Sequence, residues 1–187
     1  MKPANARVAP RLLRRRDERG ASLVEFAIVV PLVTMFLLGA IDFGSIFSNQ
    51  ISVRQGVREG ARSGVVGQFG SVNTCLNTFT VGMTPSADMQ ELMCLVKNRV
   101  GVTPQSSVYT KVFFDSTYAI NSGLIVCVLM PAKSITGFTT QLLGAKFIES
   151  KVEMSIEVIS GQSEVGGEEA PPPGATWSWC TASGSTP

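Results

Sequence analysis

Residues 14–47 read RRRDERGASLVEFAIVVPLVTMFLLGAIDFGSIF, and this stretch decides how the rest of the chain is organised. Every residue from Arg14 to Arg19 is charged, and the charged run stops at Gly20. An almost unbroken apolar run follows, in which Glu25 is the only charged residue before Asp42. A helix of about 20 residues, rising about 1.5 Å per residue, crosses a hydrocarbon core of about 30 Å. The stretch therefore predicts one transmembrane helix with a basic leader in front of it.

The distribution of charge indicates the orientation of this helix. The chain has a net charge of +2, but the positive charge is concentrated in residues 1–20, and the remainder is mildly acidic. Basic residues next to a membrane helix stay on the cytoplasmic side. We therefore expect the N-terminus inside and everything after the apolar run outside, with Asp42 hydrated at the far surface of the membrane. A mildly acidic mature chain gives no indication of nucleic-acid binding.

A cleaved secretory signal also consists of a basic region followed by an apolar one, so it is an alternative to a retained anchor. Such a signal ends in a pattern of small residues, for which Leu38-Gly39-Ala40 is the nearest match and a poor one. The apolar run is also long for a signal. We therefore expect the run to stay in the mature protein.

Glu25 lies inside the apolar run, where a carboxylate costs a few kcal/mol at the centre of a bilayer. A cut after Gly20 would create an amine on Ala21, four residues before Glu25 and therefore on the same face of the helix. Glu25 could pair with this amine in its own chain or in a neighbouring subunit. The alternative is that Glu25 lies near the membrane surface and has no role. The leader, the small residue, the lone Glu and the apolar run occur together, which favours pairing.

These features resemble those of a known class of proteins. A short basic leader that ends in Gly20, followed by a mature chain whose fifth residue is Glu25, is similar to the prepilin-peptidase substrates of the type IV pilin class. More narrowly, VEFAIVVPLVTMFLLGAIDFG (Val24–Gly44), with REGAR (Arg58–Arg62), resembles the TadE-like pseudopilins of tight-adherence pili. Phe26 departs from the major pilins of that system, which carry Tyr at this position, and it suits a minor pilin better.

The resemblance covers roughly the first third of the chain and implies a function. It implies a non-enzymatic minor pilin, cut between Gly20 and Ala21, in which Glu25 serves assembly. The implied partners are a prepilin peptidase, other pilins and minor pilins, the inner-membrane pilus assembly platform and membrane lipid. The implied location is the bacterial cytoplasmic membrane and then the pilus or the cell surface. The alternative function is a single-pass, membrane-anchored extracytoplasmic module for binding or adhesion.

The residue types present argue against an enzyme. The chain contains no histidine, so neither a Ser-His-Asp nor a Cys-His set can be composed. No CxxC spacing points to zinc, and we expect no metal and no cofactor. Glu149, Glu153 and Glu157 share one face of a predicted strand, where a solvated surface is expected rather than acid-base chemistry.

Four cysteines, Cys75, Cys94, Cys127 and Cys180, all follow the apolar run. An even number of cysteines on the oxidising side of a membrane predicts two disulfides, for which three pairings are possible. We favour Cys75 with Cys94 and Cys127 with Cys180. The C-terminal stretch is rich in Gly, Pro and Ser, a composition that builds no core, yet it carries Trp177 and Trp179 next to Cys180. We therefore expect this end to dock back onto the domain.

The helix is expected to continue to about Val66, with a bend or a melted turn at Pro31. Small residues recur at every fourth position of its outer half: Ala40, Gly44, Ser48, Ser52, Gly56, Gly60 and Gly64. This spacing lets another helix approach closely, whereas without such packing each Gly weakens a helix by up to about 1 kcal/mol. A ridge from Val53 to Val65 is expected to face a core. A second ridge, Arg54, Arg58 and Arg62, is expected to face water or an acidic neighbour.

The whole pattern predicts an α+β fold, in which an antiparallel sheet of about three strands packs on the outer half of the long helix. The expected divisions are a leader (1–20), a transmembrane segment (21–47), the extramembrane half of the helix (48–66), an α+β domain (67–160) and a tail (161–187). Periodicity predicts a helix from Pro85, capped by Thr84, to Gly101, a short helix at Thr139–Leu143, and strands at Val108–Phe114, Leu124–Met130 and Phe147–Ile159. A further short strand is expected at Leu76–Val81.

Two of these strands carry a clear burial pattern. Leu124–Met130 is apolar throughout, which is typical of a central strand covered on both faces. Phe147–Ile159 alternates, so that Ile148, Val152, Met154, Ile156 and Val158 are expected to point inward.

Overall fold

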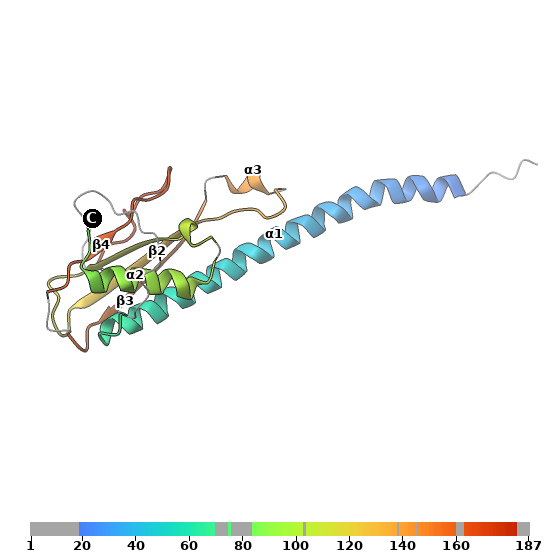
Figure 1. Ribbon diagram of the computed structural model, residues 1–187. Coiled ribbons are helices and arrows are strands. Elements are labelled where there is room, and N and C mark those ends of the chain that lie inside the picture. The colour runs from blue at the N-terminus through green and yellow to red at the C-terminus, as the bar shows by residue number, and fades with distance from the viewer. Residues whose placement is uncertain are drawn as a thin grey trace, which may run out of the picture. The chain divides into compact units, whose positions relative to one another are not determined.

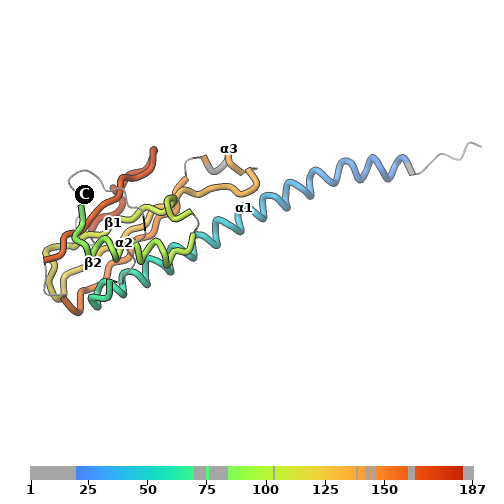
Figure 2. The backbone as a smooth tube through the Cα atoms, in the orientation of Figure 1, coloured from blue at the N-terminus to red at the C-terminus, as the bar shows by residue number. Residues whose placement is uncertain are grey.

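A computed structural model of the chain describes residues 19–69, 75, 84–102, 104–137, 139–144, 146–159 and 163–182 (Figures 1 and 2). The chain divides into two units, Met1–Leu38 and Gly39–Pro187. Helix α1 (Arg19–Val65) runs through the boundary between these units, which confirms the long N-terminal helix predicted from the sequence. The helix continues through Pro31, so its backbone does not melt there.

The second unit contains the remaining elements, and the predicted α+β class is confirmed. They are α2 (Ala87–Val100), the 3-10 helix η1 (Gln105–Ser107), β1 (Tyr109–Phe114), β2 (Gly123–Pro131), α3 (Thr140–Leu143), β3 (Phe147–Ser155) and β4 (Gly167–Glu168). The strands form one antiparallel sheet in the order β3-β2-β1-β4. The three predicted strands are therefore present, and a fourth, which the sequence did not suggest, extends the sheet.

Strand β2 lies in the middle of three layers, which confirms the prediction that both of its faces are covered. Every residue from Gly123 to Met130 is buried. Side chains alternate along the strand, so Leu124 and the residues at every second position join the core made with α1 and α2. Ile125, Cys127 and Leu129 point to the other face and pack with Trp177 and Cys180 of the C-terminal segment.

Helix α1 contacts α2 through a face made of glycines, and Figure 1 shows the two helices side by side. A Cβ atom added at Gly56 would lie 2.6 Å from the backbone nitrogen of Val100, and one added at Gly60 would overlap Cγ2 of Val96. One added at Gly64 would lie 2.6 Å from Cδ2 of Leu124. The helices therefore approach so closely that no side chain fits at these glycines.

The C-terminal segment from residue 163 to 182 docks on the domain. Strand β4 pairs with β1, and Glu169, just after it, is buried. Lys97 Nζ forms an ion pair with Glu169, whose Oε2 also accepts a hydrogen bond of 2.6 Å from the backbone nitrogen of Thr110. Trp177 Nε1 donates to the carbonyl oxygen of Glu169 over 2.9 Å. Composition suggested that this stretch builds no core, but its buried residues form part of one, because the sheet offers it an apolar face.

Two element ends differ from the sequence predictions. Helix α2 begins at Ala87 with Ser86 as the capping position, not at Pro85, and it ends at Val100, followed by Gly101, whose φ of 66° is left-handed. Strand β3 ends at Ser155, because the next residues bond elsewhere: the backbone nitrogens of Glu157 and Val158 both donate to the carbonyl oxygen of Val65.

These end effects change one burial prediction. Val158 was expected to point inward, but it lies beyond the end of β3 and is 51% exposed. The short strand predicted at Leu76–Val81 lies outside the described residues.

Candidate functional site

The predicted cleavage point lies at the start of α1. Gly20, Ala21 and Glu25 all lie within the helix and are exposed. A Cβ atom added at Gly20 would meet no atom within 4 Å. No described residue covers Gly20, Ala21 or the Glu25 side chain, so the Glu25 carboxylate is free to meet a group of another subunit.

The first unit presents an apolar surface all the way around the helix. Every residue from Gly20 to Leu37 is exposed, and the most exposed large side chain is Phe36, at 79%. A helix that is apolar on all sides needs an apolar surrounding, such as lipid or other helices. α1 is long and apolar enough to cross a membrane, and the described part of the chain contains one such helix.

The predicted packing residues divide into two groups. Gly56, Gly60 and Gly64 are covered within the chain by α2 and β2. Gly44 is exposed, and a Cβ atom added there would meet nothing within 4 Å. Pro31 is also exposed. The small residue at position 44 is therefore not used for packing by any described residue.

Asp42 belongs to the second unit, and its surroundings differ from those expected. It was predicted to be hydrated at the membrane surface, but it is fully buried. Three backbone nitrogens and three hydroxyls from the loop after β2 donate to its carboxylate. They are Ile135 N (3.0 Å) and Thr136 N (2.9 Å) to Oδ1, and Ser134 Oγ (2.6 Å), Thr136 Oγ1 (2.8 Å), Thr139 Oγ1 (2.7 Å) and Thr139 N (3.3 Å) to Oδ2.

These donors replace water around the carboxylate. Both oxygens of the carboxylate accept hydrogen bonds from protein groups although the side chain is buried. The Asp42 side chain is therefore enclosed within the second unit, while Ile41 and Phe43 beside it in α1 are exposed.

Sequence reasoning missed this arrangement because Asp42 and Thr139 are 97 positions apart. The only local signal was the density of hydroxyls in the stretch from Ser134 to Thr140, which reads SITGFTT.

The arginine ridge of α1 lies on the exposed surface. Arg54, Arg58 and Arg62 are all exposed, as is Arg99 at the end of α2. Arg58, Arg62 and Arg99, with Gln55, Glu59 and Met154, line an open hollow of about 460 Å³. Among the described residues, the ion pairs are made by lysines and none by these arginines. Both alternatives for this ridge, water and an acidic neighbour, therefore stay open.

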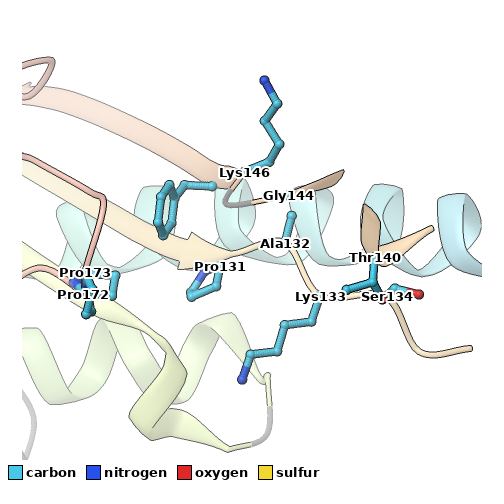
Figure 3. A pocket seen from close by; sticks show the side chains of 10 residues that line it. Pro131, Ala132, Lys133, Ser134, Thr140, Gly144, Lys146, Pro172 and Pro173 are labelled. Carbon is cyan, nitrogen blue, oxygen red and sulfur yellow. The ribbon is translucent and has the colours of Figure 1, made fainter. Parts of the chain in front are cut away.

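A second hollow, of about 390 Å³, lies where the loop after β2 meets β3 and the C-terminal segment (Figure 3). Its lining includes Lys133, Lys146, Phe147, Pro172 and Pro173, and none of the described lining residues carries a carboxylate. In the described part of the chain, no group of three or more His, Cys, Asp or Glu could hold a metal ion.

The four cysteines form two disulfides in the structure. Cys75 is bonded to Cys94 of α2, and Cys127 of β2 is bonded to Cys180, with Cα atoms 5.6 Å and 6.2 Å apart. This is the pairing favoured from the sequence. The second bond holds the C-terminal segment on the outer face of β2.

A single exposed apolar helix at the N-terminus of an α+β domain defines a class of protein, one that a single helix can anchor in a membrane. Residues 20–62 of the chain match the family model of the TadE-like proteins. The match confirms, over this segment, the resemblance inferred from Val24–Gly44 and Arg58–Arg62. No curated protein and no solved structure matches the chain.

Proposed function

We propose that this protein is a minor pilin, or pseudopilin, that takes part as a non-enzymatic structural component in the assembly of a tight-adherence, type IV-like pilus. The proposal rests on the overlap of the family match with the exposed apolar segment of α1. The match to TadE-like proteins covers residues 20–62, and within it lies the apolar segment from Gly20 to Leu37, which is exposed at every residue. The first part of the matched segment is therefore the part that needs an external partner.

This exposed segment suits two successive surroundings. Before assembly, membrane lipid covers its apolar side chains, with the N-terminus in the cytoplasm and the domain outside. During assembly, the helices of other pilins and minor pilins replace the lipid. The inner-membrane assembly platform passes the subunit from the membrane to the base or tip of the pilus, so the helix exchanges one apolar environment for another at little cost.

Processing prepares the helix for this exchange. A prepilin peptidase cuts between Gly20 and Ala21 and removes the basic leader. The cut leaves a charged amine on Ala21, about 6 Å along the helix from Glu25. In the growing pilus, Glu25 pairs with the amine of a neighbouring subunit, so neither charge stays unpaired in an apolar environment.

The substitution Glu25→Ala tests the proposal. We expect the variant to be cleaved and held in the membrane, because the cleavage point and the apolar surface are unchanged. We expect it to be strongly depleted from sheared pili, because its amine has lost its partner. Immunoblots of the membrane and sheared fractions give the distribution, and mass spectrometry gives the N-terminus. Glu59→Ala, on the exposed face of the same helix, is the matched control and should enter pili normally.

Several outcomes would contradict the proposal. A mature chain that starts near Ile41, or an intact Met1, excludes the cut at Gly20. If Glu25→Ala enters pili at the wild-type level, Glu25 has no role in assembly. If deletion of the whole protein leaves pili unchanged, a membrane-anchored extracytoplasmic module for binding or adhesion becomes the better description.

A further inference from the structure

We propose that the loop between β2 and β3 is a second membrane contact, which rests on the anionic phospholipid headgroups of the outer leaflet. The structure describes residues 132–137, 139–144 and 146 of this loop, here called the α3 loop. The inference rests on the proposed function in one respect, namely that α1 spans a membrane. It adds a lipid-binding surface on the domain itself.

The depth of the α3 loop follows from its bonds to Asp42. About 20 residues of helix from Ala21 cross a hydrocarbon core of about 30 Å, so α1 leaves the hydrocarbon near Asp42. The donors Ser134, Thr136 and Thr139 lie within 2.6 to 2.8 Å of its carboxylate through their hydroxyls. Because hydrogen bonds are this short, the α3 loop lies at the same level as Asp42, next to the membrane surface.

The α3 loop is held firmly at that level. At its base, the backbone nitrogen of Ala132 donates to the carbonyl oxygen of Lys146 over 2.9 Å. At its tip, the backbone nitrogen of Gly137 donates to Ser134 Oγ over 2.8 Å, and the Ser134 hydroxyl in turn donates to Asp42. A loop fixed at both ends presents a defined surface.

The tip of the α3 loop exposes an apolar side chain, while the backbone nitrogen of the same residue is hydrogen-bonded. Ile135 is 72% exposed, while its backbone nitrogen donates to Asp42 Oδ1 over 3.0 Å. Ile41 and Phe43, the two neighbours of Asp42 in α1, are exposed as well. A single exposed isoleucine is common on protein surfaces. Exposed apolar side chains on both sides of Asp42, at the level where a membrane begins, are instead suited to contact with lipid.

The charges at the base of the α3 loop select the kind of lipid. Lys133 and Lys146 are both exposed. Figure 3 shows their side chains extending in opposite directions, so they do not converge on one small anion. Two separated ammonium groups fit an extended array of phosphates, such as a bilayer with anionic headgroups, while their alkyl stems lie against apolar surface.

A fluorescent label at position 135 tests the inference in the full chain. The described cysteines are all in disulfides, so Ile135→Cys adds one thiol for an environment-sensitive dye such as NBD. In vesicles of phosphatidylcholine and phosphatidylglycerol, we expect blue-shifted emission and quenching by spin-labelled lipids. The matched control is Ile120→Cys, which replaces an isoleucine that is 54% exposed at the other end of β2. There we expect emission typical of water and no lipid quenching.

The control position lies far from the level of Asp42. Asn121, next to Ile120, bonds to Ile156, close to Val65 at the end of α1. Asp42 lies 23 residues before Val65 in the same helix, about 35 Å at 1.5 Å per residue. A label there cannot reach the membrane surface that Asp42 marks.

The same experiment also tests whether Lys133 and Lys146 contribute to lipid binding. Lys133→Gln combined with Lys146→Gln should lower the lipid-contacting fraction of the label at 135, by about fivefold for each lysine. The decrease should disappear when phosphatidylcholine is the only lipid.

A third label, in Val29→Cys, reports whether α1 is inserted. If position 29 is quenched by lipid and position 135 is in water, the inference is wrong and the proposed function stands. The inference is also wrong if position 135 is shielded only after other pilins are added, because a protein then covers the loop. If position 29 is itself in water, α1 does not span the bilayer, and the proposed function fails with the inference.

Discussion

At the scale of single residues, Asp42 shows how a buried charge can organise a loop. Its carboxylate accepts hydrogen bonds from three hydroxyls and three backbone nitrogens, which leaves no need for water. A carboxylate whose oxygens are fully bonded favours one arrangement of its donors over all others, because any donor that leaves exposes an unpaired group. Asp42 is therefore the residue that fixes the α3 loop to α1.

Asp42→Asn should loosen this loop while it leaves the rest of the domain folded. The new amide group has one oxygen and one NH2, so in either orientation the NH2 faces a backbone N–H that cannot accept, that of Thr139 or those of Ile135 and Thr136. We expect the backbone amides of Ile135 and Thr136 to exchange hydrogen at least about tenfold faster. Hydrogen exchange followed by mass spectrometry measures this effect.

Asp115→Asn is the matched control for that measurement. Asp115 Oδ1 accepts a hydrogen bond of 2.8 Å from the backbone nitrogen of Gly123, at the opposite end of β2. This variant should leave exchange in the α3 loop unchanged. Equal exchange in the Asp42→Asn protein and the wild type would show that the loop is held by its base alone.

At the scale of elements, α1 uses its small residues in two ways. Along its outer half, Gly56, Gly60 and Gly64 allow α2 and β2 to approach, and any added carbon overlaps a neighbour. At Gly44 the space is open. The small residues at every fourth position of α1 therefore pack against α2 and β2 near the C-terminal end of the helix. At Gly44 the same spacing leaves an exposed surface without a side chain.

Gly60→Ala and Gly44→Ala should consequently have opposite effects on stability. At position 60 the methyl group overlaps Val96, and such overpacking lowers the free energy of unfolding by about 1–3 kcal/mol. At position 44 nothing is displaced, and the higher helix propensity of Ala raises it by up to about 1 kcal/mol. Thermal unfolding of both proteins in detergent, followed by circular dichroism, measures the difference. A destabilised Gly44→Ala protein would contradict this division of α1.

The sequence was most informative where an element's pattern is local. The apolar run of α1 and the continuous apolar stretch of β2 each reveal their structure within one segment, because length and periodicity suffice. The contacts of Asp42 and Glu169 could not be predicted, since Thr110 and Glu169 are 59 positions apart. Strand β4 was missed because a two-residue strand has no periodicity, and it forms only where the edge of β1 offers partners.

At the scale of the whole molecule, the second unit is closed from outside by its own C-terminal segment. Trp177 and Cys180 cover the face of β2 that the helices do not reach. The Cys127–Cys180 disulfide spans 53 positions, against 19 for Cys75–Cys94. In the chain-entropy model the longer loop makes the former bond worth about 1 kcal/mol more.

Removing Cys127–Cys180 should therefore release the segment and destabilise the domain. We expect Cys127→Ala with Cys180→Ala to lose about 2–4 kcal/mol of unfolding free energy and to shift the combined fluorescence of Trp177 and Trp179 to longer wavelength. Cys75→Ala with Cys94→Ala is the control and should leave the tryptophan emission unchanged. Denaturant titration and emission spectra provide both readings. Unchanged emission in the first variant would mean that the ion pair of Glu169 suffices to hold the segment.

The C-terminal segment that covers β2 is the last described part of the chain to be synthesised, which affects how the domain folds. If translocation proceeds from the N-terminal anchor, the outer face of β2 remains bare until residues 163–182 have emerged. A polypeptide truncated before Trp177 would display Ile125 and Leu129 to quality-control proteases, as well as an unpaired Cys127 thiol. Folding of the domain is therefore completed only after the C-terminal segment has emerged and has covered this face of β2.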